Sequence, residues 1–138
     1  MDEGVRFTNG YVAHGVSGPS RAAIMTGRAP ARFGVYSNTD AQDGIPRTET
    51  FLPELFQNHG YYTAAVGKWH LSKISNVPVP EDKQTRDYHD NFTTFSAEEW
   101  QPQNRGFDYF MGFHAAGTAY YNSPSLFKNR ERVPAKGY

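Results

Sequence analysis

The chain has 138 residues, with 14 lysines and arginines balanced by 14 aspartates and glutamates, so its formal net charge is zero. This length suits about one domain, and the balance of charges argues against a nucleic-acid partner. The absence of cysteine excludes disulfides and thiolate metal sites, while 10 Phe, 9 Tyr and 2 Trp argue against disorder. No apolar run is long enough to span a membrane, and the first residues do not carry a signal-peptide pattern.

The chain opens with a predicted strand. Residues 5–9 alternate apolar and polar side chains, a pattern that predicts a short strand continuing through Tyr11 and Val12. His14 lies in the loop that follows, where a solvated position is favoured and contact with a substrate is the alternative. This loop delivers Ser17 to the start of a helix.

The run SGPSRAAIMTGR, which begins at Ser17, predicts a helix whose N-terminal end carries candidate catalytic groups. Pro19 suits the first helical position and Gly27 the end of the helix. We expect the free backbone N–H groups of Ser20 and Arg21 to form an anion site beside Ser17, where the guanidinium adds a forked positive charge. This arrangement would hold a tetrahedral oxyanion. A serine that only caps the helix is the alternative.

The middle of the chain predicts a second helix and a second strand. Turn-forming residues fill 29–48, and a helix follows over 50–58 with Thr50 as its cap and Pro53 in its first turn. Its apolar residues share one face: Leu52, Leu55 and Phe56. Residues 61–66 predict a short strand. Alternating strands and helices are typical of an α/β fold with a parallel sheet, whose ligand sites lie at the carboxyl ends of the strands.

Two basic side chains follow this second strand. If the chain stays extended, Lys68 and His70 project to the same side, because side chains of a strand alternate. An ammonium and an imidazole placed together can bind a sulfate-like anion and move a proton. The alternative interpretation is a solvated Lys68 and a packed His70.

The last third of the chain carries weaker signals. Residues 75–104 are polar and irregular, which predicts a long surface loop with at most a short helix near 96–100. His89 and its neighbouring carboxylates show no convincing metal-ligand spacing. The aromatic segment 105–113 is expected in the core, and the basic segment 128–132 on a solvated face.

These motifs together resemble the sulfatase family of the alkaline-phosphatase-like superfamily. Every position of its signature, Cys or Ser-x-Pro-Ser-Arg followed by an apolar pair and Thr-Gly, is filled in the run at Ser17. Residues 60–70, GYYTAAVGKWH, resemble the second signature at a family-like distance. The segments GVRFTNGY before the first signature and RGFD at 105–108 extend the resemblance over almost the whole chain.

The resemblance implies part of an alkaline-phosphatase-like α/β domain, with a mostly parallel sheet flanked by helices that is incomplete in this chain. Sulfatases are several-fold longer, begin with a strand that ends in metal-binding aspartates, and supply further site residues later. None of these can be placed here, so we expect residues 1–138 to be a partial catalytic domain with 75–104 as a surface loop within it.

In the family the first signature residue, here Ser17, is oxidised to formylglycine, which also contacts a calcium ion whose other ligands would lie outside this chain. The serine form resembles bacterial sulfatases matured by a radical enzyme. One hydroxyl of the hydrated aldehyde attacks sulfur and releases the alcohol, and the other expels sulfate. Arg21 would hold the modified side chain, Lys68 would bridge it to the sulfate, and His70 would accept a hydroxyl proton.

The implied function is hydrolysis of a sulfate monoester, with a sulfated carbohydrate favoured, in a full-length parent located in the periplasm or otherwise outside the cytoplasm. The isolated chain is expected to be inactive. Lys68 and His114 are candidate substrate-binding residues, although packing is favoured for His114 and for Tyr120. A phosphate or phosphonate ester hydrolase of the same superfamily and an inactive fragment are the alternatives.

Overall fold

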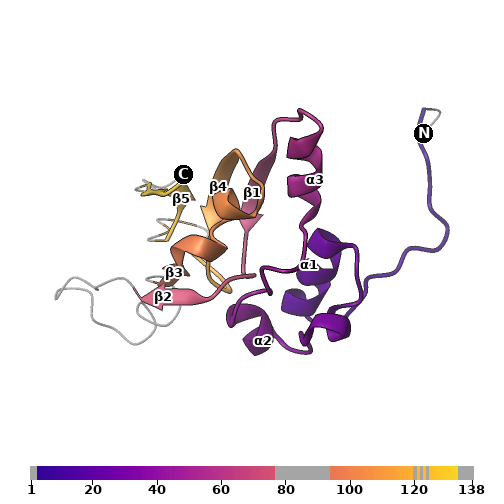
Figure 1. The fold of residues 1–138 in the computed structure, drawn as a ribbon, viewed down its shortest axis with the longest axis horizontal. Helices are drawn as coiled ribbons and strands as arrows, with labels where there is room; N and C mark the ends of the chain where they lie inside the picture. Colours follow the sequence, from indigo (N-terminus) through magenta and orange to yellow (C-terminus); the bar gives the residue numbers. More distant parts are fainter. Residues whose placement is uncertain (1–2, 77–93, 120, 122, 124, 134–138) are drawn as a thin grey trace.

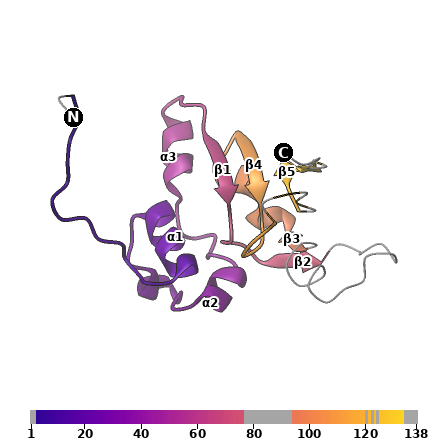
Figure 2. The same ribbon diagram turned by 180° about the vertical axis from the view of Figure 1, so that it is seen from behind.

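The computed structural model describes residues 3–76, 94–119, 121, 123 and 125–133. Three helices lie together beside one edge of a small sheet: α1 (Ser17–Thr26), α2 (Asn38–Gln42) and α3 (Leu52–Asn58) (Figures 1 and 2). Short 3-10 turns cover Pro30–Phe33, Glu98–Trp100 and Pro102–Arg105. Within the described ranges, no helix has the length and apolar character needed to cross a membrane.

The sheet has the order β1-β4-β5-β6, formed by Ala64–Lys68, Tyr109–Phe113, Phe127–Lys128 and Glu131–Arg132. β1 and β4 are parallel, with Ala64 opposite Tyr109 and Lys68 opposite Phe113, whereas the other neighbours are antiparallel. A separate antiparallel pair joins β2 (Ile74–Asn76) to β3 (Thr94–Ser96). The α/β class is therefore as predicted, and the carboxyl ends of β1 and β4 lie side by side.

Two glycines lie opposite each other in this parallel pair. Gly67 has a φ of 108°, a backbone conformation that residues with a side chain rarely adopt. Its partner in the register is Gly112, where an added Cβ would overlap the carbonyl oxygen of Gly67. The end of β1 can therefore approach β4 only because Gly112 has no side chain, whereas glycine at position 67 is favoured by its positive φ.

A core of buried apolar side chains joins the helices to the sheet. The indole of Trp69 lies with its ring centroid 6.0 Å from those of both Phe51 and Phe107. Its Nε1 donates a hydrogen bond of 3.0 Å to the backbone oxygen of Trp100. The core members are Ala22, Val35, Ala41, Ile45, Phe51, Trp69, Leu71, Phe107, Phe110 and Phe127. Phe107 and Phe110 are buried as predicted for the aromatic segment, whereas Tyr109 and Phe113 are half-buried. The basic residues of 128–132 are exposed, as expected.

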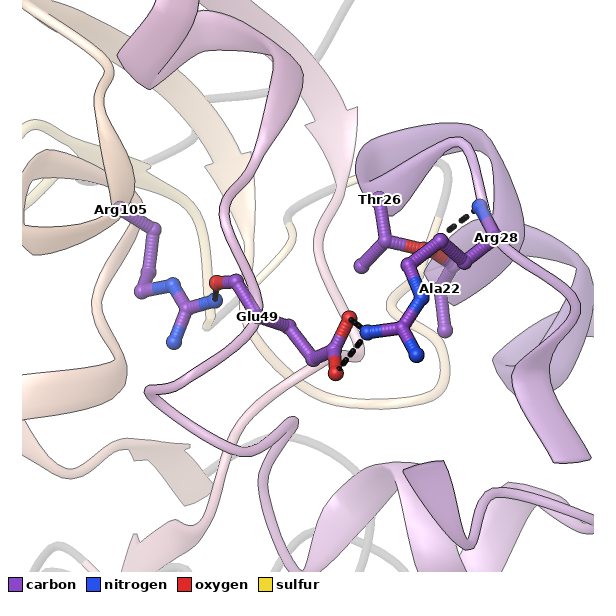
Figure 3. A network of polar contacts seen from close by, with 5 residues as sticks. All are labelled: Ala22, Thr26, Arg28, Glu49 and Arg105. Atoms are coloured by element: carbon purple, nitrogen blue, oxygen red, sulfur yellow. Dashed lines mark hydrogen bonds and ion pairs between the residues drawn. The ribbon is translucent and has the colours of Figure 1, made fainter. Parts of the chain in front are cut away.

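A polar network connects the end of α1 to two distant segments (Figure 3). Arg28 donates from Nη1 to both carboxylate oxygens of Glu49, at 2.5 and 2.6 Å. The buried Arg105 donates from Nη2 to the backbone oxygen of Glu49 at 2.8 Å. Thr26 Oγ1 accepts a hydrogen bond of 3.2 Å from the backbone N–H of Arg28. The chain that leaves α1 is thus fastened to the segments before α3 and β4.

The strand predicted over residues 5–9 and at Tyr11 and Val12 is wrong. This segment is irregular and extends away from the helices and the sheet in both ribbon views. A strand forms only where a second strand satisfies its backbone hydrogen bonds, and no described segment pairs with these residues. Its apolar side chains are consequently exposed, at 83% for Phe7 and 92% for Tyr11.

The second helix begins later than predicted. α3 starts at Leu52 with Phe51 as its N-cap, because Glu54 Oε2 accepts the backbone N–H of Phe51 at 2.5 Å. The expected cap, Thr50, therefore lies outside the helix, although Pro53 is in the first turn as predicted. The residues of the predicted apolar face are exposed: Leu52, Leu55 and Phe56.

The second strand is displaced along the chain, from the predicted 61–66 to Ala64–Lys68. Asp108 Oδ2 accepts a hydrogen bond of 2.8 Å from the backbone N–H of Thr63. A side chain thus takes the place of a strand partner for this N–H, just before β1 begins at Ala64. Tyr61 and Tyr62 precede this closure and are exposed. The partner strand, β4, therefore determines where β1 begins.

Regular elements occupy both ends of the segment predicted as a long loop, residues 75–104. β2 and β3 pair at its two ends, and the short helix expected near 96–100 is the 3-10 turn Glu98–Trp100. Residues 77–93, with His89, lie outside the described residues, as does Tyr120. The loop and the absence of a metal site at His89 stay predictions.

The contact between the two glycines predicts a steep penalty for a single methyl group. We expect Gly112→Ala to lower the free energy of unfolding by about 3 kcal/mol, because the backbones of β1 and β4 must separate. Gly117→Ala is the matched control, since an added Cβ there meets nothing within 4 Å, and it should change stability by about 0.5 kcal/mol at most. Urea denaturation of both variants measures the difference, and equal stabilities would contradict the close approach.

Candidate active site

The helix α1 begins two residues before the predicted position. Val16 is the N-cap, Ser17 is the first helical residue, and the backbone N–H of Ser20 donates to Val16 O at 3.2 Å. Pro19 is thus the third helical residue rather than the first. It is tolerated there because the first backbone N–H groups of a helix have no acceptor within the helix. Gly27 ends the helix with a φ of 65°, as predicted.

The hydroxyl of Ser17 does not cap the helix, since no side-chain cap hydrogen bond is present at this terminus. Instead, Ser17 Oγ accepts a hydrogen bond of 3.0 Å from Nε of Arg21, one turn later. The same guanidinium donates from Nη1 to the backbone oxygen of Lys68 at 2.7 Å. Arg21 therefore connects the candidate nucleophile at the start of α1 to the carboxyl end of β1.

The anion site expected from the N–H groups of Ser20 and Arg21 is wrong, because the N–H of Ser20 is used within the helix. Two of the earlier N–H groups have side-chain acceptors from outside the helix. Gly18 donates to Oδ1 of Asn38 at 2.6 Å, and Val16 donates to Nδ1 of His14 at 3.1 Å. The positive character of the site therefore comes from side chains more than from the helix terminus.

The chain continues beside β4 past the end of β1 and changes direction at His70. The backbone N–H groups of Trp69 and His70 donate to Phe113 O at 2.9 Å and His114 O at 3.0 Å, so the parallel pairing continues past β1. His70 then adopts a φ of 56°, which is uncommon for a residue with a side chain. The projection of Lys68 and His70 to the same side stays a prediction. Lys68 is half-buried, and His70 is 1% exposed.

The imidazole of His70 has one partner that the sequence does not reveal. Nε2 of Gln42, the last residue of α2, lies 3.0 Å from Nε2 of His70. Nδ1 of His70 is buried and has no hydrogen-bond partner among the described residues. Gln42 belongs to no motif and lies 28 residues before His70, so only the folded chain brings the two together.

The site is cationic and partly removed from water. Burial lowers the pKa of Arg21, and burial together with the charge of Arg21 lowers the pKa of Lys68. The pKa of His70 falls to about 4, chiefly through burial and then through the charges of Lys68 and Arg21. Among the described residues, no carboxylate forms an ion pair with Arg21 or Lys68. Two cations without an internal counter-ion and a neutral histidine favour an anionic ligand.

His114 lies behind this site, in the core. It is 1% exposed, and its ring packs edge-on against Phe110 and Phe127. Its Nδ1 is 2.7 Å from Oγ of Ser96, which in turn shares a hydrogen bond with Ser72, two residues after His70. Burial lowers the pKa of His114 to about 4. The packing that the sequence favours is thus present, and contact of His114 with a substrate stays a prediction.

The described residues alone do not form a metal site. No group of three or more His, Asp or Glu side chains in the described ranges is placed to hold a metal ion. The side chain that contacts Ser17 is a cation, Arg21, which disfavours a metal at that point. A depression of about 270 Å³ lies beside β1, with Arg21, Met25 and Lys68 in its wall, but its lining includes neither Ser17 nor His70.

The sequence matches the family model described as Sulfatase over residues 1–137. It is 99% identical over 138 residues to a protein of Escherichia coli (strain K12) named uncharacterized sulfatase YdeN. The match covers 100% of this chain and 25% of that protein. An arylsulfatase of Hemicentrotus pulcherrimus is 39% identical over 112 residues, covering 78% of this chain and 17% of that enzyme. The chain thus spans a quarter or less of the length of these relatives.

A solved structure shows the same arrangement of elements. The crystal structure of Ps i-CgsB in complex with k-i-k-neocarrahexaose superposes with a TM-score of 0.70 at 28% identity. The match covers 93% of this chain and 29% of that protein.

The two buried histidines predict a pH dependence of stability. Histidine in the unfolded chain titrates near 6.5, whereas His70 and His114 do so at about 4 when folded. The unfolded state therefore binds more protons between these values, and the free energy of unfolding falls as the pH drops through this window. His114→Gln should reduce the slope between pH 6 and 5 by as much as about 1.4 kcal/mol per pH unit. Denaturation curves at several pH values measure this. Parallel pH dependences in variant and wild type would contradict the lowered pKa of His114.

Proposed function

Since this chain belongs to the sulfatase family, we propose that residues 1–138 supply part of the active site of an enzyme that hydrolyses sulfate monoesters. One observation carries the proposal: Arg21 links Ser17 Oγ to the backbone of Lys68 at 3.0 and 2.7 Å, in a cationic site without a described carboxylate partner. Such a site complements the negative charge of a sulfate group and of its transition state.

The proposal assigns a role to each of the four residues. Ser17 is the attachment point of the nucleophile after oxidation to formylglycine, whose hydrated aldehyde supplies two hydroxyl groups. Arg21 orients that side chain through Nε, because the rest of its guanidinium is fixed on β1. Lys68 and His70 face the substrate, with Lys68 as a point charge on a sulfate oxygen and His70 as a hydrogen-bonding group.

The described residues of this chain do not by themselves supply a site for calcium, a family feature. In the proposal, modified Ser17 contributes one oxygen to the ion, and the other ligands come from outside this chain. As further parts of the proposal, the substrate is a sulfated carbohydrate, the maturing enzyme is of the serine-type radical class, and the protein acts outside the cytoplasm. The structural neighbour with a bound neocarrahexaose supports a carbohydrate substrate.

The modification of Ser17 is the first test. We expect a protein of full sulfatase length that contains this chain, co-expressed with a serine-type maturase, to lose two hydrogens in the tryptic peptide 7–21 and to react there with a hydrazine. It should then hydrolyse an aryl sulfate in preference to the matched aryl phosphate. An unmodified Ser17 beside a converted control sulfatase would contradict the formylglycine proposal. A preference for the phosphate would identify a phosphohydrolase of the same superfamily.

Removing the guanidinium tests the role of Arg21. Arg21→Ala should raise the barrier for kcat/KM by about 2–4 kcal/mol, the effect of losing one preorganised donor to the developing charge. Arg28→Ala is the matched control, because it removes an arginine that contacts Glu49 rather than Ser17. The measurement is made on protein whose Ser17 conversion has been quantified. An unchanged kcat/KM for Arg21→Ala would exclude the proposed role.

A further inference from the structure

The amide of Gln42 lies opposite His70, on a helix that is fixed at its other end. Its helix, α2, is closed by a capping box in which Ser37 Oγ accepts the N–H of Asp40 at 3.2 Å and Asp40 Oδ2 accepts that of Ser37 at 2.8 Å. α2 is also locked to α1, because Asn38 Oδ1 accepts the N–H of Gly18 at 2.6 Å. A side chain at the end of such a helix is a firm point from which to fix an imidazole.

The atoms that meet determine which nitrogen of His70 carries hydrogen. Nε2 of the Gln42 amide can only donate, so the ring nitrogen that it meets at 3.0 Å, Nε2 of His70, is the acceptor. In a neutral imidazole the hydrogen then resides on Nδ1. This is the nitrogen that is buried and has no partner among the described residues, on a side chain that is 1% exposed. An unsatisfied buried donor is costly unless a ligand supplies its acceptor.

We propose that Gln42 is a positioning residue that holds His70 in the Nδ1–H form, so that His70 donates a hydrogen bond to an oxygen of the substrate sulfate or of modified Ser17. This inference rests on the proposed sulfatase function. It differs from the role implied by family resemblance, in which His70 accepts a proton, because acceptance at Nδ1 requires the hydrogen to be on Nε2.

The charged groups around His70 agree with a neutral donor. Lys68, from β1, and Arg21, from α1, are the charged residues that act on it, and both disfavour a third positive charge. The contact from α2, Gln42, is uncharged. A neutral N–H beside two cations adds a directed donor for an anion without further charge repulsion.

Gln42→Glu tests the proposal, because a carboxylate beside Nε2 of His70 can only accept and therefore forces the opposite ring form. At pH 8 we expect kcat to fall about 10–100-fold with KM little changed. As the pH falls, His70 in the variant becomes protonated and regains hydrogen on Nδ1. The ratio of variant to wild-type kcat should therefore rise with acidity. A variant that is fully active at pH 8 and loses activity in acid would overturn the proposal in favour of a proton acceptor at Nδ1.

Two further variants separate this role from a structural one. Gln42→Leu removes the amide without adding an acceptor, and we expect a loss of kcat that does not recover in acid. Thr39→Glu is the matched control for added charge, since it adds a carboxylate to the same helix at an exposed position and should leave kcat unchanged. If Glu and Leu at position 42 lower activity equally at every pH, Gln42 only supports packing and the proposal fails.

The ring nitrogens can also be observed without turnover. In the full-length protein labelled with 15N-histidine, His70 should show hydrogen on Nδ1 in the wild type and on Nε2 in Gln42→Glu. His70→Gln identifies the signals. A wild-type His70 with hydrogen on Nε2 would overturn the inference even if the enzyme hydrolyses sulfates. The predicted ring form in a protein without sulfatase activity would instead leave the Gln42 contact standing and reject the proposed function.

Discussion

The guanidinium of Arg21 is the interaction on which the site depends. It holds Ser17 Oγ with one nitrogen and the backbone of Lys68 with another, across 47 residues of sequence. A lysine could supply the charge at this point, but its single ammonium group has no rigid fork with which to fix two partners in one geometry. The relative position of the helix and the strand is therefore determined by the same group that provides positive charge. This explains why a short arginine-containing motif carries so much of the functional information in the chain.

Local patterns predict the parts of the fold that depend on local chemistry. The helix that follows Ser17, its end at Gly27, and a strand before Lys68 are all present, since each is encoded within a dozen residues. The prediction errors arise where a residue distant in the sequence determines whether a strand forms or where it begins. Residues 5–9 alternate like a strand and have no described neighbour to pair with, and the start of β1 is displaced by the side chain of Asp108.

The candidate site divides in the same way. Family-like motifs identify Ser17, Arg21, Lys68 and His70, whose roles stay predictions, but they say nothing of the residues that support them. Gln42 and Asn38 lie in a stretch that indicates only turns. The contact of Asn38 with Gly18 exists only once α2 packs on α1, and that of Gln42 with His70 only once the segment after β1 reaches α2. The turn at His70 is equally hidden, because a positive φ at a non-glycine residue is imposed by its surroundings rather than by its own preference.

The spacing of these contacts along the chain also implies an order of assembly. The contact between Asn38 and Gly18 closes a loop of 20 residues. The contact between Arg21 and Lys68 spans 47 residues and also requires β1 to pair with β4. Closing a longer loop costs more entropy, so the three helices are expected to associate before the strand arrives. During synthesis there is consequently an interval in which α1 has formed but Arg21 does not yet have the backbone oxygen of Lys68 as its acceptor. In that interval the Ser17 hydroxyl is fully solvated, whereas in the folded chain Ser17 is half-buried and its hydroxyl is hydrogen-bonded to Arg21.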